Sequence, residues 1–364
     1  MDNGCTSGLD TENTRTLNSA GSNPGCEQPT GKAGKFSTAL TQSLGIRHPI
    51  LCGGLMWLAN AKYVGAVVNA GGMGFITPRS YPSLSDFKAG LRECNDLTAG
   101  KPFGVNLFIA ARDEENTHLH DYLDLSLKEG VRVFETAGRS PEAILSKIHQ
   151  AGGKVFHKVT ALRHAVKAAR IGVDGVIVLG GECGGHPGAN TVPAMVMAAL
   201  IRPQITVPLI VGGGIGSGRQ LLAALALGAD GVLMGSRMLV ADEIWAHTDY
   251  KQRLLEADEN ATRTVLSSVG NTYRCLDNKT ARKVSELEAA GVRDFETLAP
   301  YIRGVVQREA YTSGDFEKGI LSLGPAIAFA DRLEPVADII DRIVQEAVDA
   351  SKILNKKQLS PEPV

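Results

Sequence analysis

The sequence predicts a single TIM-type (β/α)₈ barrel, an α/β fold, with a helical excursion after its eighth strand. Three observations predict it. Eight apolar strand candidates alternate with helix candidates within roughly 200 residues, several of the strands end in glycine-rich loops, and the last two of these loops have the form of phosphate cradles. A doubly wound sheet is the alternative. It is disfavoured because the chain has no early G-x-G-x-x-G motif followed by an acidic residue.

The expected strands are short apolar runs, most of which stop at glycine or at a polar residue. They are expected at His48–Gly54, Gly74–Thr77, Phe103–Ile109, Val131–Thr136, Val155–Thr160, Gly175–Leu179, Leu209–Gly213 and Gly231–Gly235. The helices lie between them, at Ala61–Asn69, Leu84–Cys94, Leu119–Lys128, Pro141–Gln150, Ala161–Ile171, Val192–Ile201 and Gly218–Leu227. The barrel is expected to comprise residues 36–241 together with 320–354.

The remaining segments differ in composition. Residues 1–35 are rich in Gly, Ser, Thr, Asn and Pro, which predicts a disordered leader. Residues 242–319 are polar, charged and helical, for example at Tyr250–Glu259, and predict a helical lid or subdomain with no sign of separate folding. The apolar stripe of Pro325–Ile353 predicts a last helix over the barrel, and residues 355–364 are expected to form a flexible tail.

Composition disfavours several functional classes. The chain has 364 residues and a formal net charge of −1, so charge gives no reason to expect binding to nucleic acid or to an anionic membrane. No apolar stretch approaches the roughly 20 residues of a membrane span. The six cysteines lack CxxC spacing, which disfavours zinc and predicts the reduced thiols of a cytoplasmic protein. Nothing in the sequence predicts an oligomeric state.

The most informative segment is the loop that follows the strand Gly175–Leu179. In it, four glycines surround Glu182, Cys183 and His186. Glycine backbones can approach a flat ligand closely, and a histidine titrates near neutral pH, so His186 is the expected catalytic acid or base. A flexible loop with a surface histidine is the plainer interpretation. Cys183 as a nucleophile is a further one, disfavoured because residues three apart in such a loop need not face each other.

Two later strand ends predict a phosphate site. Val207–Gly214 ends in three glycines, and Asp230–Arg237 contains a Gly-Ser pair at the end of its apolar run. Free backbone N–H groups at a strand end and a helix N-terminus bind phosphate, and barrels often use the loops after strands seven and eight for this purpose. The phosphate is therefore expected on the backbone of Gly213, Gly214, Gly235 and Ser236.

Other strand ends supply groups suited to a flat ring. Gly53 and Gly54 would let an aromatic ring lie against the backbone, and Asn106 could hydrogen-bond its edge. Lys158 is a cation on an apolar strand, and because burial of an unpaired ammonium is costly, it is expected to face an electron-rich ligand atom. His157 alternates to the opposite face and is expected to be structural. Together with the cradles, these groups predict flavin mononucleotide (FMN). No metal is expected, because no acidic or histidine cluster has ligand spacing.

Over residues 37 to about 350, the chain resembles the nitronate monooxygenase family, formerly called 2-nitropropane dioxygenases. The motifs that carry the resemblance are His48-Pro-Ile-Leu-Cys-Gly-Gly54, Lys101-Pro-Phe-Gly-Val-Asn106, Gly130-Val-Arg-Val-Phe-Glu-Thr-Ala-Gly138, His157-Lys158-Val-Thr-Ala-Leu-Arg163, Glu182-Cys-Gly-Gly-His186-Pro-Gly188, Gly212-Gly-Gly-Ile215 and Met234-Gly-Ser-Arg237. The resemblance implies non-covalent FMN, a role as base for His186, and flavin contact by the segment Gly319–Gly324. The expected cofactor-binding residues are then Gly53, Gly54, Leu55, Met56, Asn106, Lys158, Glu182, Gly184, Gly185, Gly212, Gly213, Gly214, Gly235, Ser236, Ser322 and Gly324.

The longest match is most similar to a branch of the family in which some members are NADH:quinone reductases. The chain departs from that branch at Leu55-Met56-Trp57, where Met-Gln-Trp is common, and at Ala189-Asn190, where acidic residues are common. The favoured function is therefore FMN-dependent nitronate monooxygenase, which oxidises alkyl nitronates with O₂ to a carbonyl compound and nitrite. The alternatives are an NAD(P)H:quinone reductase, a flavin-dependent enoyl-thioester reductase and a non-catalytic flavin-binding protein. The expected partners are a small-molecule substrate (nitronate or quinone), O₂ and, for a reductase, NAD(P)H.

Overall fold

The structure, a computed structural model, describes residues 36–357. Its centre is a closed barrel of eight parallel strands in sequence order, in which β1 pairs with both β2 and β8. The strands are β1 (Ile50–Cys52), β2 (Met73–Ile76), β3 (Gly104–Ile109), β4 (Val133–Gly138), β5 (Lys154–Val159), β6 (Gly175–Leu179), β7 (Leu209–Gly212) and β8 (Gly231–Met234). The predicted (β/α)₈ barrel is confirmed.

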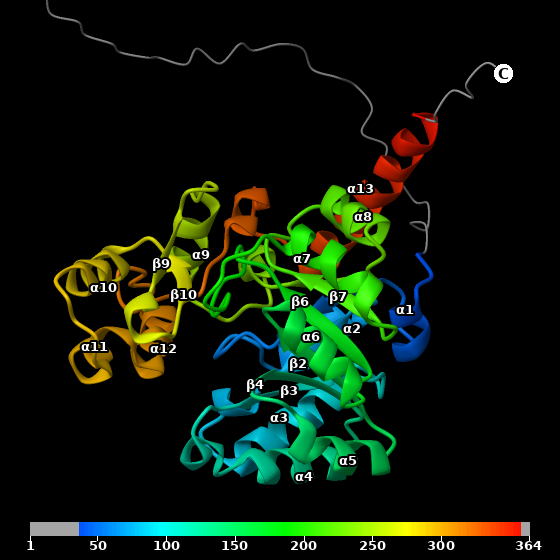
Figure 1. Ribbon diagram of the computed structural model, residues 1–364, viewed down its shortest axis with the longest axis horizontal. Coiled ribbons are helices and arrows are strands. Elements are labelled where there is room, and N and C mark those ends of the chain that lie inside the picture. Colours follow the sequence, from blue (N-terminus) through cyan, green and yellow to red (C-terminus); the bar gives the residue numbers. More distant parts are fainter. Residues whose placement is uncertain (1–35, 358–364) are drawn as a thin grey trace, which may run out of the picture. The chain divides into compact units, whose positions relative to one another are not determined.

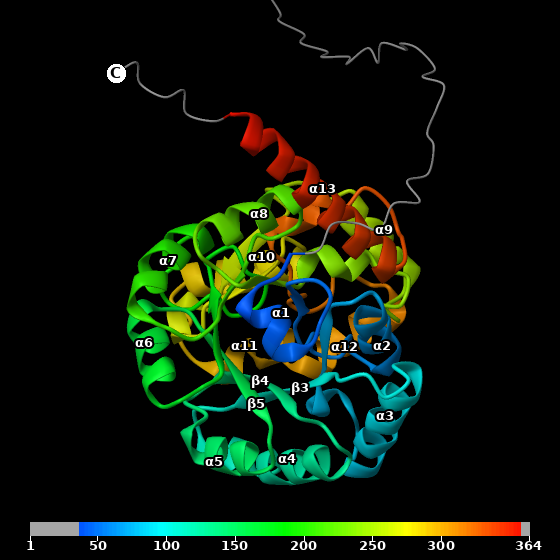
Figure 2. The ribbon, with the colours of Figure 1, turned by 90° about the vertical axis from the view of Figure 1, so that its right-hand side faces the viewer.

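Helices surround the barrel as a ring, which Figure 2 shows end-on. They are α2 (Ala61–Asn69), α3 (Leu84–Leu97), α4 (Leu119–Lys128), α5 (Glu142–Gln150), α6 (Leu162–Arg170), α7 (Ala194–Ile201), α8 (Gly218–Ala226) and the long α13 (Val336–Lys356). Each contributes buried apolar residues to one large core cluster that it shares with the strands. A Cβ at Gly218 would lie 2.1 Å from the carbonyl oxygen of Ile343, so α8 begins directly against α13.

A short helix that the sequence analysis did not predict, α1 (Ala39–Leu44), closes the N-terminal end of the barrel. In Figure 2 it lies in the middle of the ring of helices. Its Leu40 and Leu44 are buried and join a cluster with interior strand residues such as Phe75 and Phe156. The helix is well specified locally, because Thr38 and Thr41 form a capping box at its start.

The excursion after β8 lies at the opposite end of the barrel and contains more than helices (Figure 1). Helix α9 (Thr248–Leu255) comes first, followed by an antiparallel hairpin of β9 (Thr262–Val265) and β10 (Tyr273–Leu276) and then by α10 (Lys279–Ala289), α11 (Phe295–Ile302) and α12 (Gly304–Ser313). The predicted helical excursion after the eighth strand is confirmed, and it contains in addition a hairpin that was not predicted. The excursion also has a small apolar cluster of its own, which includes Val265, Val284 and Leu298.

The C-terminal part is more broken than predicted. Proline is the first residue of a single 3₁₀ turn, Pro325–Phe329, and α13 begins only after Pro335. Helix α13 then continues to Lys356, two residues into the predicted tail. The predicted leader and the end of the predicted tail lie outside the described residues. Within the described part of the chain, no helix is long and apolar enough to cross a membrane.

Candidate active site

The loop after β6 carries His186 to the end of the barrel that faces the excursion. Gly185 has a left-handed backbone (φ +84°), which side chains rarely tolerate. Gly184 is required for a different reason, because a Cβ there would lie 2.8 Å from the backbone carbonyl carbon of Leu323. The glycines therefore let the loop turn sharply and pack tightly against the segment that precedes the Pro325–Phe329 turn.

The β9–β10 hairpin pairs with this loop. Gly185 and Arg274 exchange two backbone hydrogen bonds, of 2.9 and 2.7 Å, in an isolated antiparallel bridge. The Arg274 guanidinium also donates to the carbonyl of Gly181 (3.0 Å) and to the hydroxyl of Thr262 (3.1 Å). The loop that carries His186 is thus fixed from outside the barrel. Sequence reasoning missed this contact because it assigned helical structure to the hairpin.

His186 lies against an aromatic residue of the hairpin. Its imidazole and the ring of Tyr273 have centroids 4.8 Å apart and planes at 86°, an edge-to-face arrangement. The imidazole keeps an exposed surface, yet the protein around it desolvates the ring and lowers its pKa. Burial raises the pKa of the Tyr273 phenol to about 12. At neutral pH the pair therefore offers one proton acceptor and one hydrogen-bond donor.

A buried polar network joins β3, β4 and β5 to the loop that follows β1. The Nζ atom of Lys158 lies 2.8 Å from one carboxylate oxygen of Glu135, whose side chain is fully buried. The other carboxylate oxygen accepts hydrogen bonds from the Asn106 amide (2.5 Å) and from the backbone N–H of Gly54 (3.0 Å). Two residues predicted separately, Asn106 and Lys158, are thus brought together by a third that was not predicted.

Glu135 changes the interpretation of its neighbours. Lys158 was predicted to need a ligand atom because it had no apparent charged partner, and that premise is wrong. A Cβ at Gly53 would lie 2.9 Å from a Glu135 oxygen, and one at Gly54 would lie 2.5 Å from the Cβ of Asn106. Protein packing alone therefore requires both glycines. Contact between these residues and a flavin stays a prediction.

The two predicted cradles lie side by side at the ends of β7 and β8, which are paired. Gly213 and Gly214 have left-handed backbones, with φ of +96° and +73°. The hydroxyl of Ser236 accepts a hydrogen bond of 2.7 Å from the backbone N–H of Gly324, which brings a residue predicted only from the family resemblance to the cradle. A Cβ at Gly235 would have only a Leu55 methyl within 4 Å, at 3.7 Å, so this glycine borders open space.

Two further predicted residues in the same region have partners within the protein. Gly212 is required by packing, since a Cβ there would lie 2.8 Å from Leu179. The carboxylate of Glu182 accepts hydrogen bonds from the backbone N–H of Ala194 (3.0 and 3.2 Å), at the start of α7. It therefore stabilises the positive end of that helix. Met56 is partly exposed in the loop after β1.

Cys183 is suited to packing, not to nucleophilic chemistry. Burial raises the pKa of its thiol to about 12, so it stays protonated at neutral pH. Within the described part of the chain, Cys52, Cys94, Cys183 and Cys275 are buried free thiols. No group of three or more His, Cys, Asp or Glu side chains in residues 36–357 could hold a metal ion.

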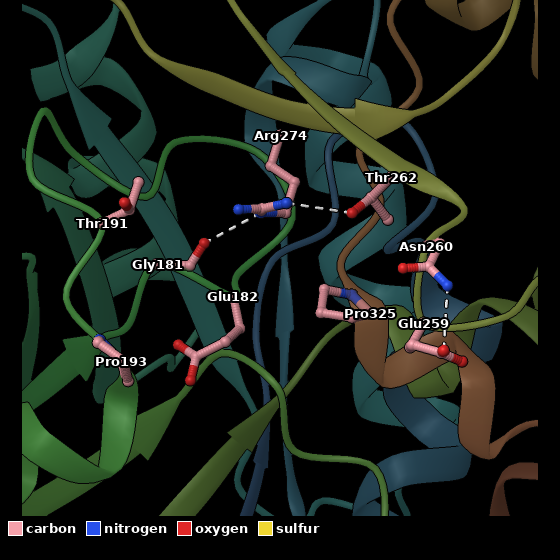
Figure 3. Close-up of a pocket in the computed structure, with 9 residues that line it drawn as sticks. All are labelled: Gly181, Glu182, Thr191, Pro193, Glu259, Asn260, Thr262, Arg274 and Pro325. Atoms are coloured by element: carbon pink, nitrogen blue, oxygen red, sulfur yellow. Dashed lines mark hydrogen bonds between the residues drawn. The ribbon is translucent and has the colours of Figure 1, made fainter.

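A cavity of about 380 Å³ lies between the β6 loop and the hairpin (Figure 3). It is lined by Gly181, Glu182, Thr191, Pro193, Glu259, Asn260, Thr262, Arg274 and Pro325. Tyr273 and Arg274 are successive residues of β10, and successive side chains of a strand point to opposite faces. The hairpin therefore presents Tyr273 to His186 and Arg274 to this cavity. Its volume is in the range of small-molecule sites.

His157 lies apart from these groups, as the alternation of the strand predicts. It is buried, and one ring nitrogen lies 2.9 Å from the Thr136 hydroxyl. Burial lowers its pKa to about 4. The structural role predicted for His157 is consistent with this environment.

The buried His157 predicts a loss of stability in acid. Its pKa is about 4 in the folded chain and about 6.5 in an unfolded one, so the unfolded state binds the extra proton. The contribution of neutral His157 to the free energy of unfolding is complete above pH 6.5 and is lost as the pH falls toward 4. We expect this contribution to reach about 3 kcal/mol. Urea unfolding at pH 7.5, 5.5 and 4.5 measures it. Between pH 7.5 and pH 4.5, His157→Gln should lose less free energy of unfolding than the wild type. The exposed control His120→Gln should lose as much as the wild type. Equal losses in His157→Gln and wild type would contradict this role.

The site can now be compared with known proteins. The family model described as nitronate monooxygenase matches residues 37–346, which is most of the chain and includes every group described above. The chain belongs to the nitronate monooxygenase family. Members of this family are flavin-dependent oxidoreductases, so the chain is an enzyme of that class. The family resemblance noted in the sequence is confirmed.

Within the nitronate monooxygenase family, the relatives differ in their named activities. The chain is 29% identical to a (3aS,4S,5R,7aS)-5-hydroxy-7a-methyl-1-oxo-octahydro-1H-indene-4-carboxyl-CoA dehydrogenase of Mycobacterium tuberculosis, over 86% of this chain and 97% of that protein. It is 27% identical to a probable nitronate monooxygenase of Staphylococcus saprophyticus, over 88% of this chain and 100% of that protein. Among solved structures, FabK from Thermotoga maritima has a TM-score of 0.82 and 29% identity, covering 89% of this chain and 100% of that one.

Proposed function

We propose that this enzyme is an FMN-dependent nitronate monooxygenase, which converts an alkyl nitronate and O₂ to a carbonyl compound and nitrite. The observation that carries the proposal is the neutral imidazole of His186, held beside a protonated phenol at the end of β6. A base of this kind suits a carbon acid, a substrate whose C–H proton is acidified by a neighbouring nitro group.

FMN fits the residues that surround this pair. Gly213 and Gly214 have left-handed backbones at the end of β7, and Gly235 borders open space that a side chain would fill. These residues and Ser236 would hold the phosphate, and Lys158 would place a positive charge at the N1/O2 edge of the ring. When bound, FMN supplies the redox chemistry, accepting electrons from the substrate and passing them to O₂.

The side chains of the protein have separate tasks. His186 takes the proton of a neutral nitroalkane, or positions the charge of a nitronate that is already formed. The Glu135 carboxylate holds Lys158 and Asn106 in fixed orientations, since both bond to it. The hairpin pairs with the β6 loop and so fixes the position of the imidazole.

A second candidate is oxidoreduction of an acyl thioester at the carbons next to its carbonyl group. The relative at 29% identity is named as a CoA-thioester dehydrogenase, and this observation favours the candidate. A proton α to a thioester carbonyl needs the same kind of base as one α to a nitro group.

Anaerobic absorbance spectroscopy of the purified enzyme loaded with FMN distinguishes these functions. We expect the flavin band near 450 nm to bleach on addition of propyl-2-nitronate, and nitrite to appear once O₂ is admitted. Bleaching by an acyl-CoA but not by the nitronate would support the second candidate. Rapid bleaching by NADH alone would support a reductase. No bleaching with any of the three would reject both proposals.

The cradle predicts a test of the cofactor. Gly235 has a negative φ (−129°), and a larger side chain there would enter the space assigned to the phosphate. We expect Gly235→Leu to raise the Kd for FMN at least about 100-fold. Riboflavin, which has no phosphate, should bind the variant and the wild type alike. Fluorescence titration of the apoprotein measures both.

A matched control is Gly152→Leu, at an open turn before β5 that is distant in sequence from the cradle. It imposes backbone strain at a φ of +72° and should retain FMN. Unchanged FMN affinity in Gly235→Leu would place the phosphate elsewhere. Gly214 gives a less specific test, because a Cβ there would meet Glu182 at 3.3 Å and its φ is also positive.

A further inference from the structure

Tyr273 places a protonated hydroxyl group beside His186, and the function above assigns that hydroxyl no step in the reaction. It comes from β10 of the excursion, whereas His186 comes from the barrel. The two rings meet edge to face, with centroids 4.8 Å apart, so the two side chains contact each other directly. The exposed surface of His186 leaves one side of the pair open.

The hydrogen bonds of Tyr273 show how its hydroxyl is held. The side-chain amide nitrogen of the buried Gln307 lies 3.1 Å from the Tyr311 hydroxyl, 3.4 Å from Ser322 Oγ and 3.5 Å from the Tyr273 hydroxyl. An amide has only two hydrogens. One therefore goes to Tyr311, and the other is shared by Ser322 and Tyr273.

Ser322 completes this arrangement. Its hydroxyl contacts that of Tyr273 directly, and a serine hydroxyl can donate one hydrogen while it accepts others. When Ser322 donates, the phenol oxygen of Tyr273 accepts from both neighbours. Its own hydrogen is then free to be donated to a third group. Burial keeps that hydrogen in place, because the pKa of the phenol is raised to about 12.

We propose that Tyr273 is a catalytic residue that donates its O–H hydrogen bond to the substrate oxygen on which negative charge develops, while His186 takes the proton from the neighbouring carbon. This inference rests on the proposed function and names the second group of its proton-transfer step. The ligand class is a carbon acid with an oxygen two bonds from the acidic carbon, such as a nitroalkane.

The step balances without a redox change. The substrate C–H bond breaks, and its proton forms an N–H bond on the neutral imidazole of His186. The C–H electron pair becomes the C=N bond of the nitronate, and the N=O electron pair moves onto oxygen. That oxygen gains the negative charge that the Tyr273 hydroxyl stabilises. The products are a nitronate anion and an imidazolium.

The test is exchange of the α-hydrogens of nitroethane in D₂O, followed by ¹H NMR without O₂ on the FMN-loaded protein. Exchange reports proton abstraction alone and needs no flavin turnover. We expect Tyr273→Phe to lower the enzyme-catalysed exchange rate about 100-fold, because the ring stays and only the donor is lost. The matched control is Tyr311→Phe, which removes another hydroxyl bonded to Gln307, and its rate should stay within about 3-fold of wild type.

Steady-state oxidation of the two substrate forms gives a second readout. For nitroethane, Tyr273→Phe should lower kcat. For preformed ethyl nitronate, whose proton has already left, it should mainly raise KM. FMN content and the urea unfolding midpoint show whether each variant is folded. If Tyr273→Phe does not fold, Ser322→Ala replaces it, with an expected loss in exchange of about 5- to 10-fold.

The outcomes separate this inference from the proposed function. If Tyr273→Phe exchanges hydrogen at the wild-type rate, the proposed role of Tyr273 is overturned. The same holds for Ser322→Ala where it replaces that variant. Nitronate oxidation by the wild type would still support the proposed function in that case. Slow exchange by that variant supports the role even if the wild type fails to oxidise nitronates. A wild type that exchanges no faster than buffer would reject both.

Discussion

His186→Asn is expected to lower turnover of a neutral nitroalkane by about 10²–10⁴-fold and to leave FMN bound. Asparagine keeps a polar group at the site but cannot accept the proton. The cradles lie on β7 and β8, so they do not depend on this side chain. The loss should be smaller for a preformed nitronate, because the histidine then only positions charge. Initial rates of nitrite release from the two substrate forms measure the difference.

The pH profile adds an independent check on His186. The surrounding protein desolvates the partly exposed ring and lowers its pKa, so the imidazole remains a base below the pH at which an ordinary histidine becomes protonated. In the wild type, kcat/KM for the nitroalkane should fall as pH falls through this lowered pKa. In His186→Asn, kcat/KM should no longer fall over this pH range. The control His118→Asn, which changes an exposed histidine far from His186 in the sequence, should show the same fall as the wild type. Wild-type rates in His186→Asn with both substrates would assign the residue a structural role.

Glu135→Leu is expected to lower the free energy of unfolding by about 3–5 kcal/mol. The carboxylate is fully buried and is the charged partner of Lys158 at 2.8 Å. Its removal leaves an ammonium in the protein interior without compensation, and it also removes the acceptor for Asn106 and for the backbone of Gly54. Urea unfolding at pH 7.5 measures the change.

The double variant Glu135→Leu/Lys158→Met separates the cost of the unpaired Lys158 charge from the cost of the lost hydrogen bonds. It removes both members of the pair, so it should recover about half of the lost stability. The remaining loss reflects the donors of Asn106 and Gly54, which still lack an acceptor. Equal stability of wild type and Glu135→Leu would show that Lys158 finds another partner or reaches water.

The barrel could be predicted because each of its strands is specified locally. β6, for example, is an apolar β-branched run that ends at glycine, and the expected Gly175–Leu179 agrees with the structure at both ends. β9 and β10 could not be found in this way. They have only four residues each, β9 is mostly polar, and the two strands pair with each other. Helix α1 was missed because it is short and directly follows the glycine-rich leader.

In the candidate site, too, the residues at strand ends could be predicted, and those that depend on contacts between distant segments could not. Strand ends of a parallel barrel meet at one face, so the loop of His186 and the two cradles could be placed near each other from the strand order alone. Glu135 was missed because an acidic residue within a strand gives no sign of which neighbour it faces. The signal was present in Lys158, two positions beyond the residue that pairs in register with Glu135. Tyr273 lies in an excursion whose docking no local pattern specifies.

The bridge between Gly185 and Arg274 joins residues about 90 positions apart, and this separation has a consequence during synthesis of the chain. A ribosome that adds roughly 5–20 residues per second completes the β6 loop on the order of ten seconds before the hairpin that fixes it. Strands β7 and β8 are also made within that interval, so the histidine exists before both the closed barrel and the strand that orients it. The arrangement of His186 and Tyr273 can therefore form only after residues 262–276 have been made.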